Sequence, residues 1–219
     1  MMQGSTSAPS VARPQGRGGL VSSSIPAMRV GAIAFASALL LGIAGVRAAN
    51  APERAEGCLT CHGETGVSQT ENIPSVAAQP TLFTQWQIVF YRIGRIKNEM
   101  MGPIAAELSD DDVRQLGAYL SSLPPPRPAD QPDDAPALTE AGKRLATENH
   151  CDNCHGPAFA GQEAAARLAG QREEYLLKAF NDYKIGVRSG TGPVKMPEVL
   201  YALKEDDLKA LAHYLSRLP

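Results

Sequence analysis

Residues 58–62 read Cys-Leu-Thr-Cys-His and residues 151–155 read Cys-Asp-Asn-Cys-His, and these two stretches use every cysteine of the chain. The pattern Cys-x-x-Cys-His is typical of covalent attachment of a c-type heme. Two thiols three positions apart on one helical turn can reach the two vinyl groups of one porphyrin, and the histidine that follows then lies under the iron as a nitrogen ligand. The sequence therefore predicts two heme c groups, attached through Cys58, Cys61, Cys151 and Cys154 and ligated by His62 and His155.

Methionines outside the N-terminal segment are candidates for the opposite side of each iron. A low-spin c-type heme needs a sixth ligand, and a thioether raises the reduction potential relative to a second imidazole. Met101 follows His62 by 39 residues, and Met196 follows His155 by 41 residues. Each half of the chain thus holds an attachment site, a proximal histidine and a distal methionine at nearly the same spacing.

Met100 is the alternative distal ligand in the first half. Adjacent residues point in different directions, so only one of these two methionines can face the iron. Met101 stands eight residues before Ser109, as Met196 stands eight residues before Lys204. The alignment of the two halves therefore favours Met101.

The first 48 residues have the composition of an export signal. Residues 1–29 are rich in Ser, Gly, Pro and Arg, which predicts disorder, and residues 30–46 form an uncharged apolar run. Val46 and Ala48 place small residues at the −3 and −1 positions of a cleavage site. We expect a secretory signal peptide and a periplasmic protein, because heme is attached to this motif outside the cytoplasm.

Two questions about this segment stay open at the level of sequence. Translation can start at Met1 or at Met28, since Met28 and the arginine after it would form a compact signal with the apolar run. The run can also remain as an uncleaved membrane anchor, although about 17 residues lie at the short edge of a bilayer span.

Cleavage would change the charge of the chain. The whole chain has 21 basic and 23 acidic residues and a net charge of −2. Residues 1–48 contain four arginines and no acidic residue, so the mature chain has a net charge of −6. No basic face for a nucleic acid is expected.

The two halves are copies of one another with a period near 93 residues, which predicts two copies of one fold. The matching pairs are 74–79 with 166–171, 90–95 with 182–187, 110–113 with 205–208, and 118–124 with 213–219. Between the copies, six prolines at 124–136 mark an extended linker. The predicted organisation is a signal peptide and leader at 1–48, a first domain at 49–123, a linker at 124–137 and a second domain at 138–219.

Both copies have helical patterns. Ser109 is a good N-cap for a helix that begins with three aspartates, whereas Lys204 is a weaker one at the same place in the second copy. Apolar residues recur at helical spacing after each cap, up to a terminal Leu-Pro. Thr139 is expected to cap a helix that runs into Cys151. Further helices are predicted at 83–96 and 173–185 and a short one at 52–57, with no strand.

The cysteines and the aromatic residues allow other interpretations. Zinc ribbons place their two Cys-x-x-Cys pairs about 15–20 residues apart, whereas 89 residues separate Cys61 from Cys151. Disulfides leave the paired histidines and methionines without a role, and a thioredoxin-like site needs a βαβ setting. Trp86, Tyr91, Tyr175 and Tyr183 can bond heme propionates or pack between helices, and His213 is expected to be structural or exposed.

The chain resembles the class I cytochromes c, and specifically the diheme cytochrome c4 group. The residues that carry the resemblance are the two heme motifs with their glycines and the stretches 101–109, 168–176 and 196–204, and it covers residues 50–219. It implies an all-α fold of two tandem class I cytochrome c domains, each wrapped round a covalently bound heme, with axial pairs His62/Met101 and His155/Met196. The first half departs from the pattern at Ala78, where the motif has glycine, and at 80–83.

This resemblance implies a one-electron carrier in a periplasmic respiratory or dehydrogenase-linked chain, with no catalytic side chain and no small-molecule substrate. Its expected partners are redox proteins, namely a terminal oxidase and an upstream reductase or dehydrogenase, and membrane association stays open. The alternatives are the cytochrome subunit of a dehydrogenase, such as flavocytochrome c sulfide dehydrogenase, and a diheme peroxidase.

Overall fold

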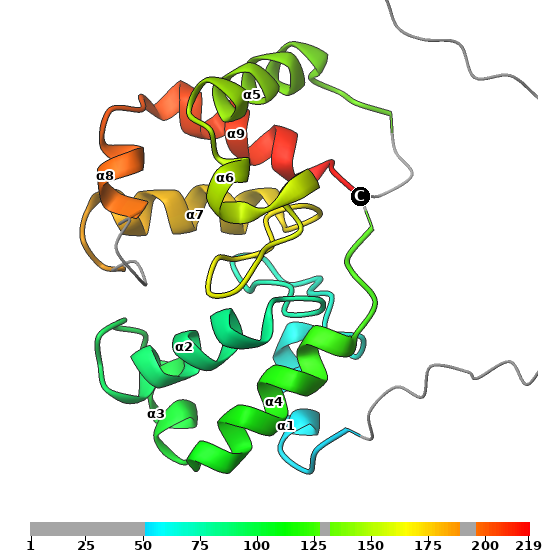
Figure 1. Ribbon diagram of the computed structural model, residues 1–219, viewed down its shortest axis with the longest axis vertical. Coiled ribbons are helices and arrows are strands. Elements are labelled where there is room, and N and C mark those ends of the chain that lie inside the picture. The colour runs from blue at the N-terminus through cyan, green and yellow to red at the C-terminus, as the bar shows by residue number, and fades with distance from the viewer. Residues whose placement is uncertain (1–50, 128–131, 189–195) are drawn as a thin grey trace, which may run out of the picture. The chain divides into compact units, whose positions relative to one another are not determined.

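The computed structural model describes residues 51–127, 132–188 and 196–219, and the secondary structure in these ranges is helical (Figure 1). The one β-type pairing among them is an isolated bridge between Gln162 and Ala165. The first copy contains α1 (Ala55–His62), α2 (Thr81–Arg92), α3 (Met101–Ala106) and α4 (Asp110–Ser122). The second contains α5 (Pro136–Glu148), α6 (Asp152–His155), the 3₁₀ turn η1 (Pro157–Phe159), α7 (Glu173–Lys184), α8 (Met196–Tyr201) and α9 (Glu205–Ser216).

The predicted all-α class is confirmed by these elements. The predicted signal peptide and leader at 1–48 lie outside the described residues, as does part of the predicted linker. The boundaries of the two domains and of the linker stay predictions. Among the described helices, none combines the length and the apolar character needed to cross a membrane.

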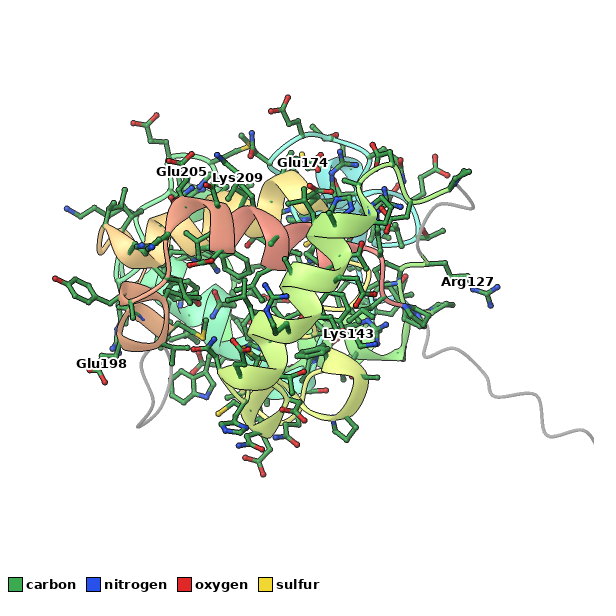
Figure 2. The ribbon with its side chains drawn as sticks, turned by 90° about the horizontal axis from the view of Figure 1, so that it is seen from above. Arg127, Lys143, Glu174, Glu198, Glu205 and Lys209 are labelled. Atoms are coloured by element: carbon green, nitrogen blue, oxygen red, sulfur yellow. The ribbon has the colours of Figure 1, made fainter. Side chains whose placement is uncertain are left out.

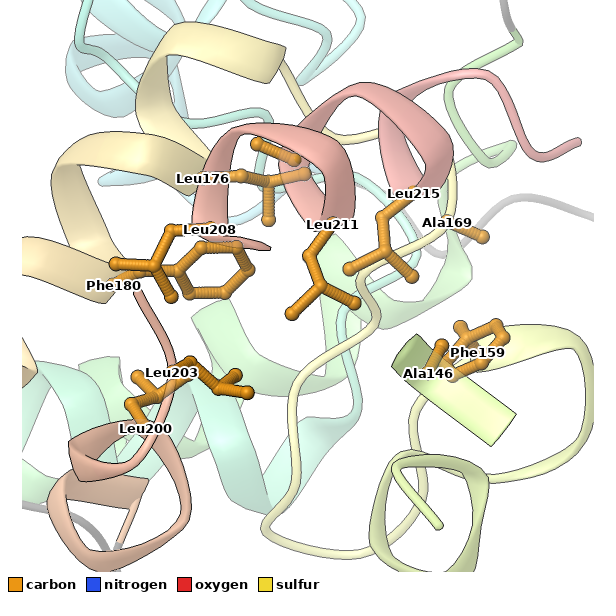
Figure 3. Close-up of a cluster of buried hydrophobic side chains, with 11 residues drawn as sticks. Ala146, Phe159, Ala169, Leu176, Phe180, Leu200, Leu203, Leu208, Leu211 and Leu215 are labelled. Carbon is orange, nitrogen blue, oxygen red and sulfur yellow. The ribbon is translucent and has the colours of Figure 1, made fainter. Parts of the chain in front are cut away.

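In the second copy, α5 packs across α9 (Figure 1). Gly142 of α5 permits the close approach, because a Cβ atom there would lie 2.1 Å from the carbonyl oxygen of Ala210 in α9. The leucines of α9 at helical spacing, Leu208, Leu211 and Leu215, are buried against α7 and the loop before it (Figure 3). Full burial of each contributes about 1.5–3 kcal/mol.

The first copy has a smaller core, made where α2 packs against α4 and α3. Its buried side chains include Ile88, Val113 and Leu116, the last of them without any exposed surface. The outer faces of the helices are charged in both copies. Figure 2 shows Glu205 and Lys209 side by side on α9, where the ammonium and carboxylate are 2.9 Å apart.

The predicted helix cap is confirmed in the first copy and is wrong in the second. Ser109 caps α4, and its hydroxyl and the Asp112 carboxylate form a reciprocal capping box. The prediction that Thr139 caps its helix was wrong. Because Pro136 is well suited to the first turn, α5 begins four residues earlier than a helix capped by Thr139 would, and the Thr139 hydroxyl donates to Asp133 instead. The helix also ends at Glu148, before Cys151.

The loop that follows each heme motif has the same hydrogen bonds in both copies. The N–H of Ala78 donates to the carbonyl of Leu120 at 2.9 Å, and the N–H of Gly170 donates to that of Leu215 at 3.1 Å. Both residues have left-handed backbones, with φ of +54° at Ala78 and +68° at Gly170. The departure from the family pattern at Ala78 is thus an alanine held in a conformation that glycine adopts freely.

Replacing Ala78 by glycine is expected to raise the free energy of unfolding by about 0.5–1 kcal/mol, because the strain of a Cβ at positive φ outweighs the added freedom of the unfolded chain. The reverse change, Gly170→Ala, is expected to lower it by more than about 1 kcal/mol, since the new Cβ would also lie 2.8 Å from the carbonyl oxygen of Pro126. Denaturant unfolding followed by circular dichroism measures both. Equal destabilisation by the two changes would contradict this account.

Candidate heme sites

The two proximal histidines are held by the same contact in each copy. The Nδ1 atom of His62, at the end of α1, lies 2.8 Å from the carbonyl oxygen of Pro74. The Nδ1 atom of His155, at the end of α6, lies 2.7 Å from the carbonyl oxygen of Ala166. A carbonyl oxygen only accepts hydrogen bonds, so Nδ1 carries the proton and Nε2 keeps its lone pair in both rings.

Both imidazoles are prepared to bind a metal as neutral ligands. Burial lowers the pKa of His62 and of His155, and in each case the bond to the backbone carbonyl opposes part of that shift. A histidine must be deprotonated at one nitrogen to coordinate a metal. A hydrogen bond from the other nitrogen to a carbonyl is the usual partner that fixes the orientation of a metal-bound imidazole.

The cysteines of each motif take up matching positions. The first cysteine of each pair, Cys58 or Cys151, is half-buried, and the second, Cys61 or Cys154, is exposed. None of these four cysteines forms a disulfide with another, and burial raises the pKa of the Cys58 and Cys151 thiols. A hollow of about 370 Å³ adjoins Cys58, with Ile104 and Leu108 in its lining.

The candidate distal methionines each begin a short helix that the sequence reading had not predicted. Met101 is the first residue of α3, and its backbone N–H donates to the Asn98 side chain at 2.8 Å. Met196 is the first residue of α8 and packs against the core of the second copy. Met100 is 59% exposed, whereas Met101 is half-buried. Ligation by Met101 and Met196 stays a prediction.

A buried arginine that the sequence reading missed lies among three of the predicted aromatic residues. Arg188 is 6% exposed, and its Nη1 donates to the Tyr175 hydroxyl at 2.7 Å. The guanidinium carbon lies 5.3 Å from the centre of the Tyr183 ring. Its Nη2 donates to the side-chain oxygen of Gln87, on α2 of the first copy, at 2.7 Å.

Within the described part of the chain, Arg188 has no acidic partner and its Nε donates to nothing. A buried charge without a counterion is costly. A free buried donor on a cation fits a carboxylate, and every heme c carries two propionates. The donor set of this chain therefore fits the group that the motifs predict, through the thiols, the neutral imidazoles and the Arg188 guanidinium.

The other aromatic and histidine candidates have different surroundings. Trp86 is 46% exposed and lines a groove with Leu82 and Val113, apart from the groups around Arg188. His213 is buried, with Nδ1 3.1 Å from a carboxylate oxygen of Glu173 and Nε2 3.1 Å from one of Asp133. Of the two expectations for His213, exposed or structural, its burial and these contacts agree with the structural one.

Comparison with known proteins agrees with this geometry. Residues 139–219 match the family model described as Cytochrome c. The chain is 32% identical over 205 residues to a protein named thiosulfate dehydrogenase electron acceptor from Thiomonas intermedia (strain K12), with 89% of this chain and 93% of that protein covered. It is 30% identical over 205 residues to cytochrome c4 of Azotobacter vinelandii, with 82% of this chain and 95% of that protein covered.

Comparison with solved structures identifies the same family. Reduced recombinant cytochrome c4 from Pseudomonas stutzeri superimposes with a TM-score of 0.66 at 27% identity, over 76% of this chain and 96% of that one. The helices and the duplicated heme sites therefore define two tandem class I cytochrome c domains. The chain belongs to the cytochrome c4 family, and it is a diheme cytochrome that carries electrons.

The tyrosines around Arg188 give the fold a sensitivity to high pH. The pKa of Tyr91 is raised to about 12, chiefly by burial; Arg188 opposes this rise, and Tyr175 and Tyr183 add to it. In the unfolded chain the hydroxyl ionises near its ordinary pKa of about 10. As the pH rises, the unfolded state loses this proton first. The contribution of Tyr91 to the free energy of unfolding is therefore complete below a pH of about 10 and is lost progressively between about 10 and about 12.

Tyr91→Phe is expected to reduce the fall in the free energy of unfolding across this pH window, because phenylalanine has no proton to lose. Denaturant unfolding of the ferrous protein at a pH below the window and at one inside it provides the comparison. Tyr119→Phe is the control, since Tyr119 lies on α4 outside this group. An unchanged pH dependence in Tyr91→Phe would contradict the assignment.

Proposed function

We propose that the mature chain is a periplasmic carrier of single electrons, with His62/Met101 and His155/Met196 as the two axial pairs. The observation that carries this proposal is the same Nδ1–carbonyl hydrogen bond in the two copies, which leaves Nε2 of both imidazoles free to bind iron. A bound heme c supplies an iron that gains or loses one electron. The side chains of this chain fix its ligation, its burial and its exposed edge, and these set the potential.

A carrier needs no substrate pocket and no acid or base side chain, and we assign no catalytic residue. A diheme peroxidase would need one iron with a displaceable ligand, whereas both copies offer a methionine at the start of a short helix. This repetition supports the carrier over the enzyme.

We infer that the electron donor is a periplasmic dehydrogenase. A relative at 32% identity is named as the electron acceptor of thiosulfate dehydrogenase, which supports a dehydrogenase-linked role. Export is supported by the apolar run at 30–46 and by the need to attach heme outside the cytoplasm. A redox partner of this kind would bind briefly through the protein surface, and the net charge of −6 predicted for the mature chain would make the rate of association depend on salt.

Met101→His is expected to abolish one methionine-to-ferric-iron absorption band and to lower one of the two reduction potentials, because an imidazole stabilises ferric iron more than a thioether does. Met100→Leu is the matched control on the adjacent residue and should leave both bands and both potentials unchanged. Absorption spectra and a spectroelectrochemical titration give the readout. Loss of the band in Met100→Leu, with the band of Met101→His unaffected, would show that Met100 is the ligand and would contradict this assignment.

Mass spectrometry of the protein purified from the periplasm is expected to show a polypeptide that begins at Ala49 and carries two hemes. The Cys58→Ala/Cys61→Ala variant should carry one heme, and so should Cys151→Ala/Cys154→Ala. A wild-type chain with one heme or none, or one found in the cytoplasm, would overturn the proposal.

A further inference from the structure

Two buried glutamines, one in each copy, hold a peptide segment of the other copy. The side-chain amide of Gln171 accepts from the backbone N–H of Ser75 and donates to the Ser75 carbonyl, both at 2.8 Å. The side-chain amide of Gln79 accepts from the N–H of Arg167 and donates to the Arg167 carbonyl, both at 3.0 Å. These four hydrogen bonds are named here the glutamine clamps.

The clamps occupy equivalent positions in the repeat. Gln79 aligns with Gln171, and Ser75 aligns with Arg167. All four residues are between 2% and 8% exposed, so the bonds are shielded from water. A buried peptide group that lost such a partner would remain unsatisfied, at a cost of about 1–3 kcal/mol.

In the first copy, the clamped peptide group is the one that holds the proximal histidine. The peptide bond between Pro74 and Ser75 presents its carbonyl to His62 Nδ1, at 2.8 Å, and its N–H to Gln171, at 2.8 Å. A single planar peptide unit therefore joins the imidazole of the first copy to a side chain of the second.

The second copy repeats this arrangement in the opposite direction. The peptide bond between Ala166 and Arg167 presents its carbonyl to His155 Nδ1, at 2.7 Å, and its N–H to Gln79, at 3.0 Å. The two hydrogen-bond chains thus cross between the copies.

We propose that Gln171 is a positioning residue for the heme ligand His62, and Gln79 for His155, so that each copy tunes the heme of the other. This inference rests on the proposed ligation of iron by the two histidines. Hydrogen bonds in a chain polarise one another. An N–H that donates to the glutamine makes the carbonyl of the same peptide a better acceptor from the imidazole.

The direction of the effect follows from the ligand. A stronger bond from Nδ1–H makes the imidazole a more basic ligand, and a more basic ligand favours ferric iron. Removing the clamp should therefore weaken the bond to the carbonyl and raise the potential of the heme in the opposite copy. If a glutamine only stabilised the contact between the copies, its removal would change the reduction potentials of both hemes alike.

The test replaces each glutamine by methionine, which has a similar length and no hydrogen-bonding amide. Gln171→Met is expected to shift the ferric–ferrous equilibrium of the first heme roughly threefold, or about 28 mV at about 59 mV per tenfold change, and to leave the second heme unchanged. Gln79→Met is expected to do the reverse. The Met101→His variant marks which of the two potentials belongs to the first copy.

A second readout does not depend on potential. In the ferrous protein labelled with ¹⁵N-histidine, Gln171→Met should move the Nδ1–H resonance of His62 toward that of a weaker hydrogen bond, with His155 unmoved. Gln171→Glu, studied at acidic pH as the neutral acid, can accept from and donate to Ser75 as the amide does, and should restore both readouts. Gln115→Met, at an exposed position on α4, is the control for the substitution itself.

The outcomes separate the two proposals. An equal shift of both hemes, a shift of the heme in the same copy as the variant, or no shift in either folded variant would overturn the crossed assignment. Because the two variants lie in different copies, either one that folds gives a decisive result. Failure of the histidine ligation itself would appear earlier, as a wild-type ferrous protein whose two hemes do not both show a histidine-ligated spectrum.

Discussion

The hydrogen bond from a histidine Nδ1 to a backbone carbonyl is the contact on which both sites depend. It settles which nitrogen is free to bind iron, and it joins the motif helix to a largely irregular loop, which in the second copy includes the short turn η1 and the bridge between Gln162 and Ala165. That loop is in turn held at Leu120 or Leu215, near the end of the last helix of each copy. The heme ligand, the loop and the core helix are thus one connected unit.

Much of this unit could be predicted from the sequence, because it depends on local spacing. The two cysteine motifs, the apolar spacing on α4 and α9, the Ser109 cap and the repeat all involve neighbours along the chain. The start of α5 was predicted wrongly because two local signals competed, and the proline at 136 prevailed over Thr139. The short helices at Met101 and Met196 have only six residues each, too few for a periodic pattern.

Arg188 and the two clamp glutamines could not be found in this way. Arg188 meets Gln87 across 101 positions of sequence, and Gln171 meets Ser75 across 96. The repeat pair at 74–79 and 166–171 includes both glutamines, but nothing in the sequence shows that they are buried, since a polar side chain on a loop is usually solvated. Their burial becomes apparent only when the two copies are brought together, and a buried amide with both ends satisfied then distinguishes a specific contact from incidental packing.

The reciprocal contact between the loops has the form of an isologous interface, the kind that joins the identical subunits of a homodimer around a two-fold axis. A single-domain ancestor with this loop would pair with itself through the same four bonds. In such a pair the two irons would be identical by symmetry, so no preferred direction of electron flow could exist inside it. Fusion into one polypeptide removes that restriction, and the difference between Ala78 and Gly170 shows that the copies have already diverged.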